Sequence, residues 1–161
     1  MPKKIEEKKE KKEKKVKVDE FFHAVGRRKE STARIRLYPA GNGKVTVGTL
    51  TVKKGEVFIN SRPAEEYFTG LASRKIYLEP FRTTNTVGRF AVTARVSGGG
   101  LNGQLGAFIH GVSRALLQID KEKFRPILRK KGFLTRDPRM RERRKAGLAQ
   151  SARAKKQSPK R

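Results

Sequence analysis

The last 26 residues limit what this chain can fold into. The segment 136–161 holds eleven lysines and arginines against two acids, has no aromatic residue, and includes only Met140 and Leu148 as sizeable apolar side chains. Such a segment buries too little apolar area to offset the entropy lost on ordering, and its like charges repel. We expect it to be disordered alone in water, to order against a polyanion, and to act as an arm that spans about 85 to 95 Å when fully extended.

The charge of the whole chain indicates the class of partner. Its 161 residues include 41 Lys and Arg against 15 Asp and Glu, a net charge of +26, which favours nucleic acid or an anionic surface. We expect no membrane partner, because no basic stretch has a broad apolar face and no apolar run approaches the roughly 18 residues of a spanning helix. The Lys/Glu-rich amino terminus lacks the apolar stretch of a signal peptide, which favours a cytosolic or organelle-matrix protein.

Residues that could carry catalysis or bind a metal are scarce. The absence of cysteine excludes disulfides, thiolate catalysis and cysteine zinc sites. His23 and His110 stand alone and no nucleophile has a base beside it, so the sequence predicts no catalytic residue, no metal site and no cofactor. An independent DNA-compacting protein would share the charge, but it should display dimeric groove-reading elements or repeats, which the sequence lacks.

Charge and apolar content divide the chain into three parts. Residues 1–20 carry nine lysines and six acids, which predicts a solvated leader or, alternatively, a phosphate-contacting extension. Residues 21–133 have the length of one small globular domain, which we expect to bind RNA. Residues 134–161 form the extended basic arm, and Phe133 and Leu134 are expected to anchor it on the domain.

Alternating side chains and turn residues predict the strands. Residues 31–38 alternate between apolar and basic side chains, which predicts a half-buried strand with a basic exposed face. After a Gly-Asn-Gly turn signal, residues 44–52 and 56–59 are predicted as the two strands of a hairpin, joined near residues 53–55. Residues 89–97 alternate again and predict a further strand.

Capping residues predict two short helices. Asn60 or Ser61 can cap a helix over residues 63–68, which has a proline in its first turn. Asp120 is predicted to cap a later helix that Gly132 stops.

The densest glycine stretch, residues 98–103, runs from a predicted strand into a predicted helix. It matches the dinucleotide-binding pattern Gly-x-Gly-x-x-Gly, but we reject a nucleotide site because Asp120, where the ribose-binding acid would be, follows a helix instead of ending a strand. Two compatible interpretations remain: a tight turn that lets strand and helix approach closely, or backbone N–H groups that bind phosphate. Gly106 and Gly111 each cost about 1 kcal/mol relative to Ala, which predicts close packing. The apolar face of this helix comprises Leu105, Phe108, Ile109, Val112 and Leu116.

Five short motifs follow one another in a fixed order along the chain. They are Gly26-Arg27-Arg28-Lys29-x-Ser31-x-Ala33-Arg34, Gly98-Gly99-Gly100-x-x-Gly103-Gln104, Ser113-Arg114-Ala115-Leu116, Leu134-Thr135-Arg136-Asp137 and Glu142-Arg143-Arg144-Lys145-x-Gly147. Together they resemble the universal small-subunit ribosomal protein nine family, bacterial type. The resemblance covers about residues 21–161, and the five motifs in order are far more specific than any one of them.

The resemblance implies a fold and a function. The expected fold is an α/β (α+β) two-layer domain, with a mixed sheet, helices on one face and a left-handed βαβ crossover. The expected function is that of a non-enzymatic structural constituent of the small ribosomal subunit in the cytoplasm, less so of an organelle ribosome. The expected partners are ribosomal RNA in the subunit head, neighbouring head proteins, and peptidyl-site transfer RNA reached by the arm.

The resemblance also implies individual contacts, which basic side chains make by neutralising phosphates and releasing counterions. Arginine can in addition fork two phosphate oxygens or stack on an unpaired base. The residues expected to bind ribosomal RNA are Arg27, Arg28, Lys29, Arg34, Arg36, Gly98, Gly99, Gly100, Gln104, Arg114, Arg136, Arg139, Arg143, Arg144 and Lys145. The residues expected to contact transfer RNA are Ser158, Lys160 and Arg161.

Three features depart from the pattern of that family. The last five residues, 157–161, lack the aromatic residue that its bacterial members usually have there, so a stacking contact is not expected. The hairpin over residues 41–55 is about a dozen residues longer than in typical members and is expected to be a surface elaboration. The Lys/Glu leader is likewise additional.

Overall fold

The computed structural model describes residues 21–39, 43–48 and 50–154. The predicted leader, residues 1–20, lies outside these ranges. In chain order the elements are β1 (Phe22–Arg28), β2 (Ser31–Pro39), β3 (Lys44–Val47), β4 (Leu50–Lys53), β5 (Val57–Ile59), β6 (Arg62–Pro63), α1 (Ala64–Tyr67), α2 (Leu71–Thr83), β7 (Phe90–Ser97), α3 (Leu101–Ile119) and α4 (Lys121–Lys130).

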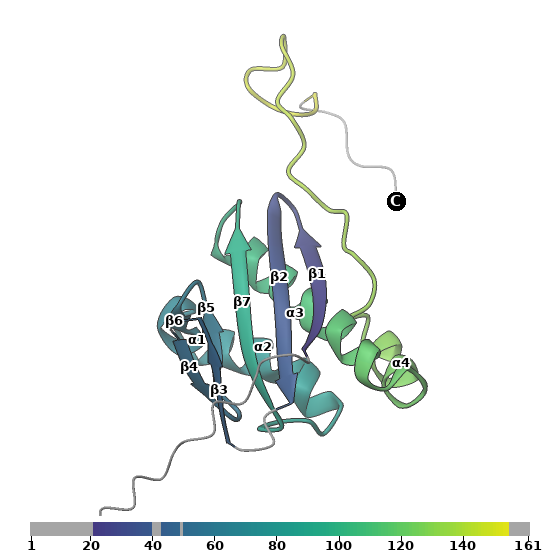
Figure 1. Ribbon diagram of the computed structural model, residues 1–161. Helices are drawn as coiled ribbons and strands as arrows, with labels where there is room; N and C mark the ends of the chain where they lie inside the picture. The colour runs from purple at the N-terminus through teal and green to yellow at the C-terminus, as the bar shows by residue number, and fades with distance from the viewer. Residues whose placement is uncertain (1–20, 40–42, 49, 155–161) are drawn as a thin grey trace, which may run out of the picture.

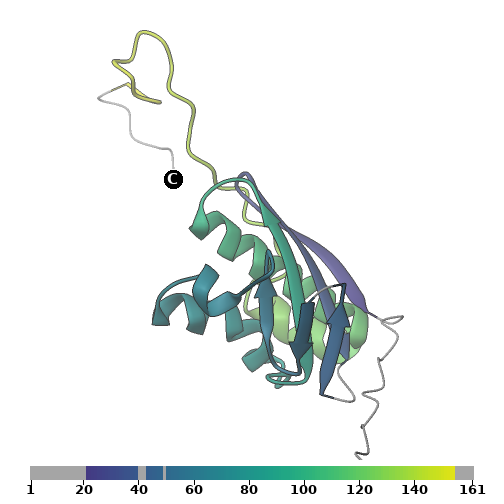
Figure 2. The same cartoon turned by 60° about the vertical axis from the view of Figure 1, so that its left-hand side comes forward.

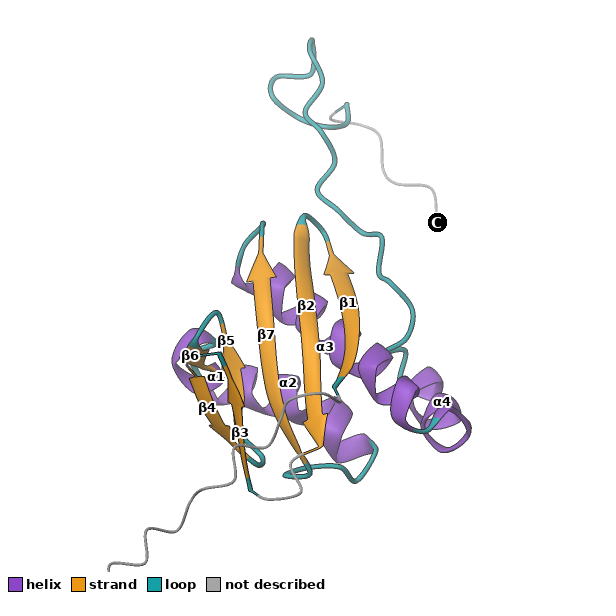
Figure 3. Ribbon diagram, viewed as in Figure 1, coloured by secondary structure: helices purple, strands orange, loops and turns teal. Residues whose placement is uncertain are grey.

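Five of the strands form one mixed sheet, in the order β1-β2-β7-β5-β6, and β3 pairs with β4 in a separate hairpin (Figure 1, Figure 3). Within the larger sheet β5 runs parallel to β7, and the other neighbouring pairs are antiparallel. The turned view in Figure 2 shows the helices on one face of this sheet. The predicted two-layer α+β architecture is therefore confirmed.

The connection between the parallel strands β5 and β7 has an unusual hand. In Figure 1 both strands point up, and the chain between them passes through α2 behind the sheet before β7 follows to the right of β5. This is a left-handed crossover, whereas parallel strands are nearly always joined in the right-handed sense. The hand agrees with the one that the family resemblance implies.

The two alternating segments fold as predicted, as β2 and β7. In β2 the side chains of Ala33, Ile35 and Leu37 are buried, whereas Arg34 and Arg36 between them are exposed. A slip of one residue would exchange the two sets and place arginines in the core. The alternation therefore fixes the register of this strand against its neighbours.

The prediction of this hairpin was wrong about which strands pair with each other. Instead of one long strand, two short strands, β3 and β4, pair with each other on either side of Gly48, whose φ is 60°. The strand β5 joins the larger sheet instead. The hairpin is held by a small second core, in which Val45 and Val52 bury against Tyr38 and Ala91 of the sheet. Strand partners are determined by such contacts between distant segments, and the short apolar runs of the sequence do not show which segments will meet.

The predicted short helix exists as α1, but neither Asn60 nor Ser61 caps it. The N-cap is Pro63, which makes no side-chain capping hydrogen bond. Asn60 and Ser61 have φ values of 48° and 67° and form the two-residue turn between β5 and β6, a conformation that asparagine tolerates well. The Asn60 side chain continues the pairing of β5 with β7, because its Nδ2 donates to the Val96 carbonyl and its Oδ1 accepts from the Val96 N–H, each at 2.9 Å.

Three elements, β1, α2 and the two-residue strand β6, were not predicted. The fully buried positions of β1 are Ala24 and Gly26, so the strand shows little hydrophobic alternation. α2 contains Pro80, which normally interrupts a helix. It is held by its aromatic residues, since Tyr77 and Phe81 are buried in the main core and the Tyr77 ring lies 6.3 Å from that of Phe108.

The predictions for the carboxy-terminal half of the domain are confirmed. The apolar face of α3 packs into the core, with only Ile109 of that face partly exposed. Asp120 caps α4, because its Oδ1 accepts from the Lys123 N–H at 3.0 Å. Gly132, with φ of 75°, ends the helical segment, and Leu134 packs against the core where the arm begins.

The strand β1 and the helix α3 touch backbone to backbone. A Cβ atom on Gly26 would overlap the Ala107 carbonyl oxygen and the Gly111 backbone. A Cβ atom on Gly111 would lie 2.6 Å from Cγ1 of Ile35. The close packing predicted from the helical glycines therefore occurs against the first two strands.

We expect Gly26→Ala to destabilise the full-length protein by about 3 kcal/mol or more, because backbone must move to make room for the new methyl group. The matched control is Gly100→Ala, since a Cβ atom there meets nothing within 4 Å. We expect the control to change the free energy of unfolding by less than about 1 kcal/mol. Denaturant unfolding followed by circular dichroism measures both, and equal stabilities would contradict the role given to Gly26.

Candidate RNA interface

Three side chains of α3 cover the outer edge of β1. The His23 N–H donates to Gln118 Oε1 at 3.1 Å, and the Arg27 N–H donates to His110 Nδ1 at 3.3 Å. Between them Arg114 Nη1 donates to the Val25 carbonyl at 2.6 Å. These α3 residues recur every four positions and their strand partners every two, so the helix runs alongside the strand and satisfies its outward backbone groups.

These contacts give His110 and Arg114 structural roles. Burial lowers the pKa of His110, and the charge of Arg114 lowers it further. The imidazole is therefore neutral at pH 7, which leaves Nδ1 able to accept the Arg27 N–H. Arg114 was predicted to bind RNA, but one of its guanidinium nitrogens donates to the Val25 carbonyl at the edge of β1.

The face of the sheet opposite the helices is basic; we call it the open face. In the register of β2 with β7, Arg34 lies directly opposite Arg95. Within the described part of the chain neither guanidinium forms an ion pair. Arg27 on β1 is exposed on the same face. Like charges directly opposite each other destabilise a sheet, and a bound anion would relieve that repulsion.

An aromatic side chain and the small hairpin bound the open face. The Arg36 guanidinium lies over the Phe21 ring at 5.0 Å, an arrangement that holds the charge near the sheet. The Phe21 ring lies 5.7 Å from that of Tyr38, which is buried under the hairpin β3–β4. The open face therefore occupies the part of the sheet that the hairpin leaves uncovered.

The glycine stretch packs against the turn between β1 and β2. Gly98 and Gly99 have φ values of 76° and 57°, and side chains on them would overlap the Glu30 carbonyl and the Ser31 hydroxyl. Ser31 Oγ donates to the Gly98 carbonyl at 3.0 Å. The predicted tight turn is therefore confirmed.

Gln104 and Gly100 differ in their surroundings. Gln104 Nε2 donates to the Gly98 carbonyl at 3.1 Å, and its Oε1 accepts from the Tyr67 hydroxyl at 2.7 Å. Both ends of this amide are used within the protein. Gly100 is the exposed N-cap of α3 and makes no side-chain capping bond, and Leu101 and Asn102 at the start of the helix are exposed as well.

An ion pair directs the arm where it leaves the domain; we call it the latch. Arg28 Nη1 lies 2.6 Å from Asp137 Oδ1 and donates to the Asp137 carbonyl at 2.9 Å. Arg139 binds the same carboxylate through Nε and Nη2. A Cβ atom on Gly106 would lie 2.9 Å from Arg28 Cγ, so this glycine makes room for the Arg28 side chain.

The latch resists acid. Hydrogen bonds from the Arg139 side chain and backbone, together with Arg28, hold the pKa of Asp137 well below its ordinary value of 3.8. Because the folded pKa is depressed, the stabilisation is fully present above pH 3.8 and is lost only as the pH falls through the lower folded value.

The arm closes on itself beyond the latch. Glu142 pairs with Arg153, whose Nε lies 2.8 Å from Oε2 of the carboxylate. Inside this closure the Lys145 N–H donates to the Ser151 carbonyl at 3.0 Å, and the Ser151 N–H donates to the Leu148 carbonyl at 2.9 Å. Figure 1 shows this loop well away from the domain. Residues 142–153 therefore form a compact basic loop instead of a straight continuation of the arm.

Apart from Gly98, Gly99 and Gly100, the residues predicted to bind ribosomal RNA divide into two groups. Those with exposed side chains that form no hydrogen bond or ion pair within the described residues are Arg27, Lys29, Arg34, Arg136, Arg143 and Lys145. Those engaged in contacts within the protein are Arg28, Arg36, Gln104, Arg114, Arg139 and Arg144. Ser158, Lys160 and Arg161 lie outside the described residues. Arg95 was missed, although its place among the apolar residues of β7 puts it on the open face.

Comparison with known proteins identifies the family. Residues 26–161 match the family described as Ribosomal protein S9/S16, which covers the open face, the glycine stretch, the latch and the arm. The chain belongs to this family. It is accordingly a structural, RNA-binding protein of the small ribosomal subunit and takes part in translation.

Membership also places the protein on the ribosome, among ribosomal RNA and other ribosomal proteins. The S9/S16 family is a structural family, not an enzymatic one. Among the helices of the described residues, none is both long and apolar enough to cross a bilayer.

We expect Asp137→Ala to loosen the root of the arm in the free protein, because Arg28 and Arg139 lose their shared carboxylate. Ion pairs near the surface stabilise only modestly, so amide hydrogen exchange at residues 133–139 should become about two- to fivefold faster. Glu142→Ala removes a carboxylate farther along the arm and serves as the control. Equal exchange at the root in the two variants would contradict the latch.

Proposed function

We propose that this protein binds small-subunit ribosomal RNA in the subunit head through its open face and its arm, and that the arm reaches transfer RNA in the peptidyl site. The observation that carries the RNA contact is the juxtaposition of Arg34 and Arg95 on neighbouring strands. Two opposed guanidinium groups are unfavourable in isolation and become favourable when a phosphate lies between them. The motifs support a bacterial-type cytoplasmic ribosome as the setting.

The open face suits a phosphate backbone more than it suits base recognition. Arg27, Arg34 and Arg95 project from three neighbouring strands, so their charges lie side by side on a rigid surface. Neighbouring strands of a sheet lie about 4.8 Å apart, so these guanidinium groups can contact one phosphate backbone together. Such a surface gains affinity by releasing counterions and discriminates RNA by its shape.

The glycine stretch brings backbone N–H groups, which carry no formal charge, to the same edge of the domain. The N–H groups at the exposed start of α3 lie next to the turn that carries Lys29, because Gly98 and Gly99 pack against that turn. Helix N-termini favour anions through these groups and through the helix dipole. We propose that this corner binds a phosphate together with Lys29.

The arm extends the RNA contact away from the domain. Its root is fixed by the latch, and its loop displays Arg143 and Lys145 on an exposed surface. Because the Glu142 to Arg153 closure already orders the loop, less conformational entropy is lost when RNA binds. Lys160 and Arg161 are proposed to contact the transfer RNA through its phosphates, as the family resemblance implies.

We expect Arg34→Gln with Arg95→Gln to weaken binding to a transcribed fragment of the subunit-head RNA. Losing two phosphate contacts should reduce the slope of log K against log salt concentration by about 1.4 to 1.8. The double variant Lys75→Ala with Arg82→Ala removes the same number of exposed charges from α2 and should leave the slope unchanged. A slope equal to that of the wild type in the first variant would contradict an RNA-binding open face.

For the arm, we expect Lys160→Gln with Arg161→Gln to leave incorporation into small subunits unchanged and to weaken peptidyl-site transfer RNA. The charges are removed while the length is kept, so a loss of about three- to tenfold in transfer RNA affinity reports phosphate contacts. Filter binding to reconstituted subunits measures it, with Lys121→Gln and Lys123→Gln of α4 as the control. Wild-type affinity would reject the direct contact.

A further inference from the structure

The open face is a grid of side chains from three neighbouring strands, β1, β2 and β7. His23, Arg36 and Thr93 lie side by side across these strands in one row, and Arg34 and Arg95 lie in the next row. The residues that make up the grid are His23, Val25, Arg27, Thr32, Arg34, Arg36, Thr93, Arg95 and Ser97. They include four arginines and no acid, so the grid is complementary to a chain of phosphates.

An aromatic ring lies at one end of the grid. Among the phenylalanines and tyrosines that the structure describes, only Phe21 is exposed, at 37%. The centre of its ring is 5.9 Å from that of His23 and 5.0 Å from the guanidinium carbon of Arg36. An exposed ring beside a guanidinium offers a π-face to a nucleobase and a positive charge to the phosphate attached to that base.

A basic surface that ends in an aromatic ring suits RNA that is not base-paired. In a duplex each base is paired and stacked between its neighbours, so it has no free face, whereas the bases of single strands can be splayed out onto aromatic side chains. Proteins that bind single strands combine a positive surface along the backbone with rings on which the bases stack. The arginines of the grid supply the positive surface, and Phe21 supplies the ring.

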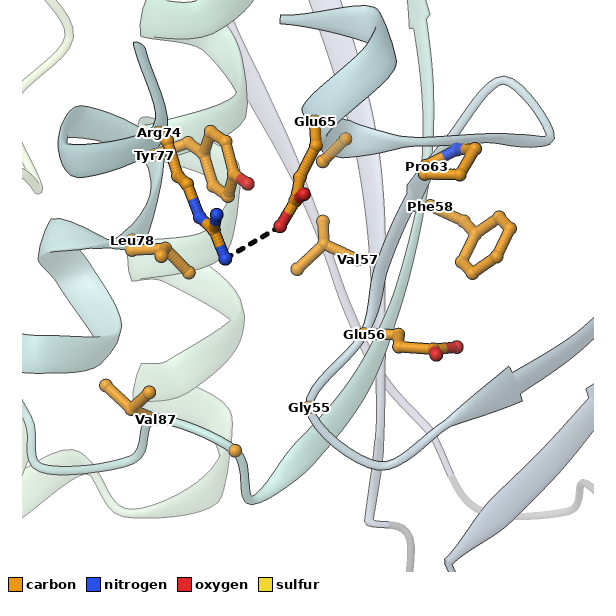
Figure 4. Close-up of a pocket in the computed structure, with 12 residues that line it drawn as sticks. Gly55, Glu56, Val57, Phe58, Pro63, Glu65, Arg74, Tyr77, Leu78 and Val87 are labelled. Atoms are coloured by element: carbon orange, nitrogen blue, oxygen red, sulfur yellow. Dashed lines mark ion pairs between the residues drawn. The ribbon is translucent and has the colours of Figure 1, made fainter. Parts of the chain in front are cut away.

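The hairpin β3–β4 covers the other aromatic residues on this side of the sheet. Tyr38, whose ring lies 5.7 Å from that of Phe21, and Ala91 opposite it are buried beneath the hairpin. On β5, Phe58 packs against the same small core, and Figure 4 shows Phe58 and Val57 pointing to opposite sides of the strand. Of the three rings, Phe21 is therefore the one that RNA can reach.

We infer that the open face binds an unpaired segment of RNA, with one base stacked on Phe21. Arg36 binds the phosphate of that nucleotide, and Arg34 and Arg95 in the next row bind a neighbouring phosphate. Stacking accepts all four bases, so the open face selects single strands over duplex without reading a sequence. The inference rests on the proposed function, because it names the class of RNA that this face binds.

The test measures filter binding of the full-length protein to an unstructured RNA strand and to a duplex of the same length. Phe21→Leu keeps an apolar side chain but removes the π-face, so we expect at least about fivefold weaker binding of the strand and unchanged binding of the duplex. Phe21→Trp keeps a ring and should bind the strand as the wild type does. Wild-type affinity of Phe21→Leu for the strand, equal losses for strand and duplex, or no recovery in Phe21→Trp would overturn the inference.

Two further measurements separate stacking from other effects. Ile76→Ala alters an apolar side chain of similar exposure, 41%, on α2 and should leave both affinities unchanged. Stacking releases no counterions, so Phe21→Leu should keep the wild-type dependence of affinity on salt, and a shallower dependence would overturn the stacking site. An unchanged salt dependence in the double variant of Arg34 and Arg95 would count against the proposed phosphate contacts but not against the stacked base.

Discussion

The backbone contact between β1 and α3 is the constraint on which the rest of the architecture depends. Gly26 and Gly111 allow the strand and helix to approach until backbone meets backbone. At that separation Gln118, Arg114 and His110 reach the outer edge of the strand. The same approach brings the end of β1 beside the start of the arm, where Arg28 meets Asp137. The core, the sheet edge and the direction of the arm thus depend on two positions without side chains.

Sequence patterns predicted the elements in which burial and alternation coincide. β2, β7 and α3 present one apolar face each, and Asp120 caps α4 in the expected way. β1 was not predicted because its buried positions are small, and α2 was not predicted because only Tyr77, Pro80 and Phe81 of its residues are buried, which leaves a short apolar face. Asn60 was assigned to a helix cap although it forms a turn, since the same side chain suits both local structures. Strand partners were the least predictable feature, because they are decided by contacts between distant segments.

For the basic residues, too, the composition and the structure give different information. Their number correctly indicated an RNA-binding protein, but not which of them are available. Arg28, Arg114 and Arg139 each hold a carboxylate or carbonyl of the protein itself. Arg95 joins the open face through a register that only its pairing with Arg34 makes evident. Sequence could rank the basic residues by motif, whereas hydrogen-bond partners separate those that shape the protein from those that face outward.

Both borders of the sheet are closed to further strands. At one border the side chains of α3 occupy the backbone groups of β1. At the other, β6 is two residues long and includes Pro63, which has no N–H to donate. Proteins that leave long strand edges open tend to polymerise edge to edge. The closed borders therefore leave the larger sheet without a long open edge on which a second chain could add a strand.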